Sequence, residues 1–516
     1  MLGKFIRIVS MVAVFVSALG MAPAVFAGAE SCDLRVNDNH KKLLECVTLA
    51  GVREHQAALQ AIADANGGIR AAGTPGYDDS LDYVVDRMTA AGYNVTLNAF
   101  PFVYVALPTL QQTAPISASY ETGAFTGSGY GNVAAAVTAV DVNLAMPRDP
   151  VTSGCEAADF AGFPAGNIAL MQRGTCAFAV KALNAQAAGA SAVIIFNQGN
   201  TPAREGLIIG TLAPSSVSIP VVGASFDQGV ALSQPGSQAS ITLAAPQNIT
   251  QYNVIAESKD GDPNNVVMAG AHLDSVQRGP GINDNGSGSA VLLEVAEQMA
   301  KVKPRNMVRF AWWGAEEAGL VGSTAYVNGL SQAERDRIAL YLNFDMVGSP
   351  NHVFFIYDGD DSDVIGAGPG PAGSAEIEKT FEAFFNMRGV PFKGTDFSGR
   401  SDYGPFIANG IPSGGLFTGA EGVKTVEEAA IWGGTAGQQY DPCYHLACDT
   451  FANNNNQALD VNSDAIAFSI LQYAMSTADI NAAKGKGNFP VVSGSTTPAP
   501  SSSIQSGLHD HEAVTE

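Results

Sequence analysis

The sequence contains little charge, and positive charge is the scarcer of the two signs. Charged residues make up 15% of the 516 residues, and 27 Lys and Arg stand against 49 Asp and Glu, which gives a net charge of −22. Typical soluble domains carry about 25% charged residues. A chain without a basic surface cannot displace the counterions of nucleic acid, and it is not attracted to anionic lipid. Both partner classes are excluded, and a soluble, exported protein of several domains remains.

Long apolar runs are also missing from the sequence, except at its beginning. Lys4 and Arg7 precede an apolar run over residues 8–19, and small residues lead up to Ala27. This order is typical of a cleaved secretory signal peptide, although an uncleaved membrane anchor would need a similar apolar length. The sequence predicts a signal peptide over residues 1–27 and a secreted product with no stable membrane association, with the periplasm or the cell surface as alternative destinations.

Cysteine is scarce, and all six cysteines follow the predicted cleavage point. An even number of cysteines in an exported chain favours disulfides over free thiols. No CxxC spacing occurs, which disfavours zinc–thiolate sites. Six cysteines allow 15 connectivities. The grouping along the chain suggests three sequential pairs: Cys32–Cys46, Cys155–Cys176 and Cys443–Cys448.

The hydrophobic pattern changes character twice along the chain. Helical spacing over residues 78–90 is followed by strand-like alternation over 94–102, and residues 116–246 then hold short Val, Ala and Ile runs with many Gly and Pro. That middle segment predicts a small β-rich module with one helix, over residues 178–188.

An alternating strand–helix pattern begins at about Tyr252. It favours an α/β fold with a mostly parallel central sheet flanked by helices. The expected strands cover residues 266–271, 307–313 and 339–344, and the expected helices cover residues 287–302, 325–340 and 464–475. We therefore divide the chain into a signal peptide (1–27), a first part of the main domain (28–115), an inserted module (116–248), the second part of the main domain (249–484) and a flexible tail that processing could remove (485–516).

Polar residues follow three of the predicted buried strands. His272-Leu273-Asp274 follows the first, Gly314-Ala315-Glu316-Glu317 the second, and Asn343-Phe344-Asp345 the third. Ligands of open α/β sheets bind at the carboxyl ends of strands. Taken singly, these residues are ordinary: an Asp after a strand often caps a helix, and a Glu pair is usually solvated.

The combination of these residues with two other segments predicts a metal centre. A Gly-rich turn contains Asp284, and a tight Cys443…Cys448 segment contains His445. Histidine nitrogens with carboxylate oxygens are the ligands of a binuclear zinc site. Magnesium or calcium would require oxygen ligands alone, so two histidines favour zinc or cobalt. Asp274 is expected to orient His272 from behind. The candidate set is His272, Asp284, Glu316, Glu317, Asp345 and His445.

Other catalytic signatures are missing. HExxH does not occur, no GxSxG turn follows a strand, and no cysteine pairs with a catalytic histidine. The pattern alone does not decide which of Glu316 and Glu317 binds metal and which acts as a base.

Five successive motifs carry a resemblance to a known family. AHLDSV, GINDNGSGSA, WGAEEAGLVGS, NFDMVGS and YHLACDT resemble those of the secreted di-zinc aminopeptidases, of the bacterial leucyl aminopeptidase type, in the same clan as glutamate carboxypeptidase and glutaminyl cyclase. The resemblance covers residues 70–110 and 250–480 and implies the zinc exopeptidase fold.

The resemblance also implies a role for each candidate residue. His272 and Asp345 would bind one zinc ion, Glu317 and His445 the other, and Asp284 would bridge them, with Glu316 as general base. The implied reaction is removal of N-terminal residues from peptides with a free N-terminus, by a metal-bridged hydroxide. The alternatives are a carboxypeptidase or a glutaminyl cyclase of the same clan, or a peptide-binding relative without catalysis.

Two further residues concern the substrate. The segment DFSGRSDYGP, residues 396–405, resembles the family's substrate-site loop, in which Arg400 would contact the peptide. Tyr444 would donate a hydrogen bond to the oxyanion. On the alternative interpretation, Arg400 only pairs with Asp396 or Asp402.

The inserted module resembles the protease-associated domain. The segment GNIALMQRGTCAFAVKALNAQAAGASAVIIFNQ carries this resemblance, which implies that the module covers or narrows the active-site cleft and influences substrate choice. A passive lid or a stability module is the alternative. Separately, the acidic run over residues 358–363 is a candidate for a structural calcium site, and a solvated loop is the alternative.

Overall fold

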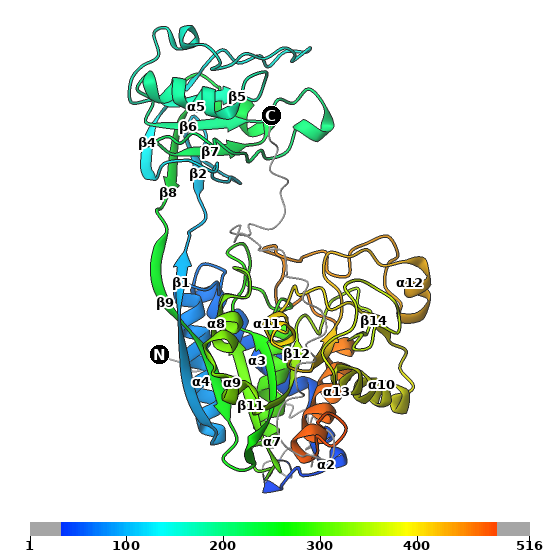
Figure 1. The fold of residues 1–516 in the computed structure, drawn as a ribbon. Helices are drawn as coiled ribbons and strands as arrows, with labels where there is room; N and C mark the ends of the chain where they lie inside the picture. The colour runs from blue at the N-terminus through cyan, green and yellow to red at the C-terminus, as the bar shows by residue number, and fades with distance from the viewer. Residues whose placement is uncertain (1–31, 33, 482–516) are drawn as a thin grey trace, which may run out of the picture.

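The computed structural model describes Cys32 and residues 34–481, which form two β-sheets with their helices. The predicted signal peptide and the predicted tail over 485–516 lie outside the described residues. Figure 1 shows the two sheets as separate bodies, joined by a long two-stranded ribbon.

The larger sheet has eight strands in the order β1-β9-β11-β10-β12-β15-β13-β14. Its middle strands β11, β10, β12 and β15 are parallel, whereas β1 and β9 pair antiparallel at one edge and β13 runs antiparallel to β15. This arrangement confirms the predicted α/β fold. The strands are β1 (Asn94–Tyr104), β9 (Gln247–Glu257), β10 (Asp262–His272), β11 (Asn306–Trp313), β12 (Ile338–Phe344), β13 (Phe355–Tyr357), β14 (Lys393–Thr395) and β15 (Ser413–Phe417).

Side chains of the central strands alternate between two cores, because successive residues of a strand face opposite sides. Val267 and Ala269 of β10 contribute to one core, and Met268 between them contributes to the other. Helices cover both faces, which explains why these strands are apolar throughout. The first core contains side chains of α3 (Leu49–Ala65), α4 (Pro75–Ala91), α7 (Gly286–Met299), α10 (Ser374–Arg388) and α13 (Asn456–Met475); the second contains those of α8 (Val321–Gly329) and α11 (Gly404–Ala408).

One predicted helix is wrong in extent. The expected helix over residues 325–340 ends with α8 at Gly329, and after the short α9 (Gln332–Arg335) the chain already enters β12 at Ile338. Ile338, Ala339 and Leu340 are fully buried in the sheet. The last residues of the expected helix fit both a helical spacing and a short buried strand. Their pairing with β10 makes them a strand.

The smaller sheet has seven strands in the order β3-β2-β8-β4-β5-β6-β7. It carries two helices, α5 (Phe178–Ala187) and α6 (Phe226–Leu232), where the sequence predicted one. Apolar side chains fill a core on each face of this sheet. The strands are β2 (Thr109–Ala114), β3 (Ala118–Tyr120), β4 (Gly131–Ala139), β5 (Ile168–Gln172), β6 (Ala192–Phe196), β7 (Val221–Ala224) and β8 (Gln238–Leu243).

The ribbon that joins the bodies is made of β1, which leaves the larger sheet, and β9, which returns to it; they pair from Asn94↔Glu257 to Tyr104↔Gln247. Beyond the ribbon, Leu107 N donates to Gln277 Oε1 (3.0 Å), and Arg278 lies 3.3 Å from Glu121. These contacts tie the smaller body to the loop that leads into the Gly-rich turn of the larger one.

Three disulfides join Cys32 to Cys46, Cys155 to Cys176 and Cys443 to Cys448. Each belongs to a different part of the fold: the N-terminal segment, the smaller body and the loop that carries His445. A search of the described residues finds no helix with the length and apolar character needed to cross a membrane.

Candidate metal centre

The parallel pairing of β10, β11 and β12 brings their carboxyl ends to one edge of the larger sheet. His272 is the last residue of β10 and pairs with Trp313, the last residue of β11. Glu316 and Glu317 follow β11, and Asp345 follows β12. Sheet register therefore places these side chains together, as expected for the ligand edge of an α/β sheet.

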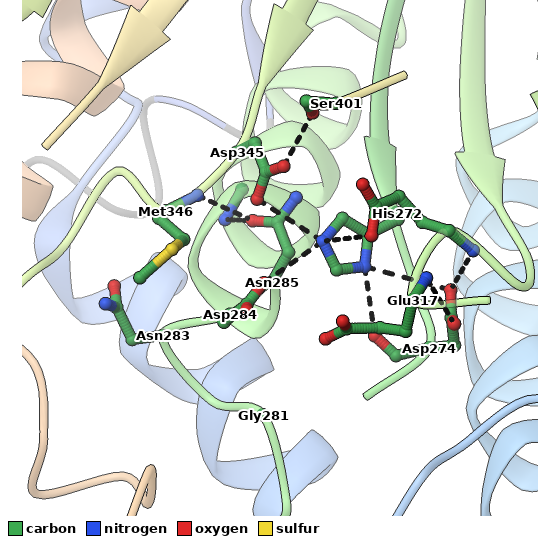
Figure 2. Close-up of polar contacts among 12 residues, drawn as sticks. His272, Asp274, Gly281, Asn283, Asp284, Asn285, Glu317, Asp345, Met346 and Ser401 are labelled. Carbon is green, nitrogen blue, oxygen red and sulfur yellow. Dashed lines mark hydrogen bonds and ion pairs between the residues drawn. The ribbon is translucent and has the colours of Figure 1, made fainter. Parts of the chain in front are cut away.

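Asp284 lies between the two histidines with one carboxylate oxygen toward each. Its Oδ1 is 3.1 Å from His272 Nε2, and its Oδ2 is 3.2 Å from His445 Nε2. His272 Nε2 is also 3.3 Å from Asp345 Oδ1, and His445 Nε2 is 3.1 Å from Glu317 Oε2. Figure 2 shows Asp345, Asp284 and His272 converging at this point. The predicted ligands thus form two triplets that share Asp284.

The donor set fits two zinc ions. Two ligand atoms at about 2.0–2.2 Å from one tetrahedral ion lie about 3.4 Å apart, close to the spacing of the ligand atoms here. Glu317 Oε1 and Asp345 Oδ1 are buried and accept no hydrogen bond. A buried carboxylate oxygen without a donor is costly, and a metal ion removes that cost.

The histidines are oriented for metal binding. His272 Nδ1 lies 3.0 Å from the main-chain oxygen of Asp274. A carbonyl can only accept, so Nδ1 carries the proton and the Nε2 lone pair faces the carboxylates. The sequence predicted that Asp274 orients His272. The hydrogen bond runs to the Asp274 main-chain oxygen, and the Asp274 carboxylate lies 3.7 Å from His272 Nδ1 while it accepts from Glu316 N (3.1 Å) and Glu317 N (3.3 Å).

The local charge balance is strongly negative. Burial and the neighbouring Asp284 raise the pKa of Glu317 to about 7, and burial with Glu317 and Asp345 raises that of Glu316 well above its usual range. Burial lowers the pKa of His445, but the Asp284 and Glu317 carboxylates outweigh it and raise it to about 11. Carboxylates this close repel one another, and protons or divalent cations can supply the compensating positive charge.

Geometry separates the two glutamates that the pattern left undecided. Glu317 reaches His445, whereas the Glu316 carboxylate comes no nearer than 3.9 Å to His272 Nε2. Glu316 is 9% exposed and also forms a possible metal-binding group with His272 and Glu317, but it belongs to neither of the two groups that contain Asp284. The shorter distance to a histidine makes Glu317 the better placed of the two glutamates for metal binding.

Arg400 pairs with neither Asp396 nor Asp402. Its Nη1 donates to Glu421 Oε1 (2.6 Å), an acceptor that the sequence did not indicate. Tyr444 stacks on His445, with ring centroids 3.8 Å apart, and burial together with Asp284 and Glu317 raises its pKa. Both residues lie beside the His445 half of the centre.

The sequence pattern did not identify several residues that position the metal ligands. The Asp449 carboxylate accepts from Asn283 N (2.8 Å) and Asp284 N (3.0 Å), and Asp441 accepts from the Asn283 side chain (2.6 Å) and from Cys443 N (2.8 Å). These contacts bind the Gly-rich turn to the disulfide loop. Asp449 lies within the YHLACDT motif, the only signal that could have identified it.

Arg70 is a second unexpected support. Its guanidinium is fully buried and donates to the main-chain oxygens of Leu273 (2.5 Å), Pro280 (2.9 Å) and Gly281 (2.7 Å). Burial lowers its pKa to about 10, against the opposing effect of Asp274 and Asp449. Arg70 thus joins the end of β10 to the turn that carries Asp284.

The acidic loop lies away from this centre. Asp358, Asp360 and Glu378 place carboxylate oxygens within 4.8 Å of one another. However, the Asp358 carboxylate accepts from Ser362 N and Asp363 N, both at 2.9 Å, and Glu378 accepts from Gly359 N at 2.8 Å. The loop's own amides satisfy these oxygens, and the calcium site stays a prediction.

Comparison with known proteins finds two matching protein families and several similar aminopeptidases. The family described as "Peptidase family M28" matches residues 253–470, and "PA domain" matches residues 138–232. An aminopeptidase of Pseudomonas aeruginosa is 53% identical over 445 residues, which are 84% of this chain and 82% of the relative. The probable lipoprotein aminopeptidase LpqL of Mycobacterium tuberculosis is 42% identical over 83% of this chain and 85% of its own.

A solved structure agrees with these relatives. The zinc aminopeptidase BSAP from Bacillus subtilis matches with a TM-score of 0.56 at 25% identity, covering 86% of this chain and 98% of that one. With more than half of its aligned residues identical to one relative over most of both chains, this chain belongs to peptidase family M28 and carries a PA domain within it.

Proposed function

We propose that this chain removes N-terminal residues from peptides at a centre of two zinc ions, with Glu316 as general base. The family and its relatives make the chain a zinc-dependent aminopeptidase, a metallo-exopeptidase. The observation that carries the residue assignment is the position of Asp284, with one carboxylate oxygen toward each histidine.

His272, Asp345 and Asp284 would hold the first ion, and Glu317, His445 and Asp284 the second. When bound, zinc supplies Lewis-acid activation of the scissile carbonyl and lowers the pKa of water at the site. Asp274 holds the main chain of Glu316 and Glu317 so that one carboxylate serves as ligand and the other stays free.

Glu316 takes the proton of the attacking water and passes it to the leaving amine, as a buried carboxylate beside the ligands can. Tyr444, stacked on His445, would donate a hydrogen bond from its hydroxyl to the oxyanion and keep its proton. Arg400, held by Glu421, contacts the peptide beyond the reacting bond.

The charges favour an aminopeptidase over a carboxypeptidase. A terminal carboxylate needs a free cation, and Arg400, the cation of the substrate-site loop, is already paired with Glu421. The acidic surroundings suit a terminal ammonium group. We therefore expect substrates with a free N-terminus; a carboxypeptidase, a glutaminyl cyclase or a non-catalytic binding protein are the competing functions.

Substrate choice tests this proposal. Leucyl-p-nitroanilide should be hydrolysed, and an N-acetylated peptide with a free C-terminus should not. Hydrolysis of the blocked peptide alone would contradict the proposal. 1,10-Phenanthroline should abolish activity, added zinc should restore it, and mass spectrometry should find two zinc ions per chain; activity unaffected by the chelator would exclude the metal mechanism.

The remaining assignments complete this proposal. A signal peptide over residues 1–27 would deliver the chain to an oxidising compartment, in keeping with its three disulfides. We propose domain boundaries at residues 28–115, 116–248 and 249–484, with β2 of the smaller sheet just before the second boundary, and an inserted domain that would limit access of long substrates to the centre.

A further inference from the structure

The two oxygens of Asp345 have different surroundings. Oδ2 accepts a hydrogen bond of 2.6 Å from Ser401 Oγ, whereas Oδ1 accepts none and lies 3.3 Å from His272 Nε2. Figure 2 shows Ser401 approaching Asp345 from the side away from the histidine. Ser401 is 5% exposed and Asp345 9%. One oxygen is thus committed to the protein and the other to the metal centre.

Ser401 is the last donor of a buried chain of hydrogen bonds. Trp313 Nε1 donates to Tyr341 OH (2.8 Å), and Tyr341 OH donates to Asn343 Oδ1 (3.0 Å). Asn343 Nδ2 then donates to Ser401 Oγ (2.8 Å). Trp313 and Tyr341 are fully buried, and Asn343 is 1% exposed.

The direction of this chain is fixed by its two ends. An indole N–H can only donate, and a carboxylate can only accept. Because Asn343 already supplies a proton to Ser401 Oγ, the Ser401 hydroxyl proton is free to point at Asp345. Hydrogen bonds to a carboxylate are roughly twice as strong as those between neutral groups, and burial strengthens them further.

The chain also connects the pieces of the centre. Tyr341, Asn343 and Asp345 alternate along β12 and its end, so that they share one face. Trp313 is the last residue of β11 and precedes Glu316 by three residues, and Ser401 directly follows Arg400. The relay therefore runs from the end of β11 to β12, and it returns to Asp345, just after β12, through Ser401 of the substrate-site loop.

We propose that Ser401 is a positioning residue that selects which Asp345 oxygen faces the metal, and that the Trp313–Tyr341–Asn343 relay orients its hydroxyl. The proposal rests on the two-zinc function above and deepens it. Without the hydroxyl, Asp345 loses the donor to Oδ2 and can rotate, so the ion held by His272 and Asp345 is bound more weakly. The ion held by Glu317 and His445 keeps its ligands.

Ser401→Ala tests the proposal in the full chain loaded with zinc. Loss of a hydrogen bond behind a metal ligand typically costs 10–100-fold in metal affinity. We expect that loss for one of the two ions, measured as zinc retained per chain during dialysis against graded chelator. Ser398→Ala is the matched control, because Ser398 lies on the same loop but its hydroxyl faces Tyr403 (3.2 Å); it should keep both ions.

A second variant protects the test against misfolding. Tyr341→Phe removes only the relay hydroxyl and retains the ring stacked on Phe406, with centroids 3.8 Å apart. It should weaken the same ion by a smaller factor than Ser401→Ala, and the zinc-free chain should remain folded with a lower Tm, because Trp313 Nε1 loses its buried acceptor. Unchanged affinity for both ions in Ser401→Ala overturns the role of Ser401, and unchanged affinity in Tyr341→Phe overturns the relay. If the wild-type chain itself binds no zinc, the proposed function fails instead.

Discussion

The two halves of the metal centre are built by different means. The His272 half grows out of the parallel sheet: His272 ends β10, is 1% exposed, and faces Asp345 just after β12. The His445 half lies on a loop, where His445 has a φ of +59° and a side chain that is 31% exposed. Strand pairing positions the first half, whereas the second depends on the Cys443–Cys448 disulfide and the Asp441 and Asp449 carboxylates.

The comparison teaches where the centre should be robust and where it should be fragile. Strand ends are held by many cooperative backbone hydrogen bonds, so a single side-chain change cannot displace them. A loop held by few contacts opens more easily. Bridging Asp284 joins both halves, and Arg70 and Asp449 hold the turn that carries it.

The largest effect is expected from Glu316→Gln, which leaves both halves intact. The amide cannot accept a proton from water, so kcat should fall by about 10²–10⁴-fold. Zinc content should stay at the wild-type level, because Glu316 belongs to neither ligand group that contains Asp284 and lies 3.9 Å from His272 Nε2. Steady-state kinetics and metal analysis of the same preparation check this. A near-normal kcat would show that another group is the base, and loss of zinc would make Glu316 a ligand.

Removal of the loop disulfide should affect the His445 half of the centre and leave the His272 half unchanged. In Cys443→Ser/Cys448→Ser the loop loses its cross-link, and the entropy model gives a destabilisation of about 2 kcal/mol for so short a loop. We expect weaker binding of the His445 ion, an unchanged His272 ion and a lower kcat, measured by chelator competition and kinetics.

The matched control is Cys155→Ser/Cys176→Ser, which removes a disulfide of the smaller body. It should lower the Tm of that body and leave both zinc ions in place. Equal loss of both ions in the two double variants would remove the distinction between the halves.

Acid stability should depend on the scaffold as well as on the metal centre. Burial and Arg87 lower the pKa of His55 to about 4, below its unfolded value of about 6.5. Between these values the unfolded chain binds a proton that the folded chain does not, so stability falls as the pH drops from 6.5 to 4. In His55→Gln, the free energy of unfolding should therefore fall by about 2–3 kcal/mol less between pH 6.5 and 4 than in the wild type.

Denaturant unfolding of the zinc-free chain at both pH values measures this effect. His352, whose pKa burial and Lys424 also lower to about 4, remains in both proteins and serves as an internal reference. Parallel pH profiles of variant and wild type would show that His55 is not the group responsible.

The smallest effect concerns the smaller body. Arg278→Ala removes the partly exposed ion pair with Glu121 and should change leucyl-p-nitroanilide hydrolysis by less than about twofold, since such pairs contribute about 0–1 kcal/mol. Hydrolysis of a long peptide should change more, because this contact fixes the inserted domain beside the loop leading to Asp284. Equal effects on both substrates would argue against a role of the inserted domain in substrate access.

Much of the fold could be predicted from the sequence, because short apolar runs such as residues 266–271, within an alternation of strands and helices, favour strands buried on both faces. The helix expected over 325–340 failed, since helical spacing and a short buried strand look alike until a neighbour pairs with one of them. The sequence pattern did not predict α6, the second helix of the smaller body, because this helix is short.

The scarcity of charge acquires a sharper meaning at the site. In a chain with few cations, Arg70 and Arg400 are each committed, one to three carbonyl oxygens and the other to Glu421. The sequence by itself determined the kinds of ligand and their order along the chain, because a zinc centre can be made from few residue types. Only the tertiary structure decided which glutamate faces His445 and which Asp345 oxygen faces His272, because those positions depend on distances between strands and loops far apart in the chain.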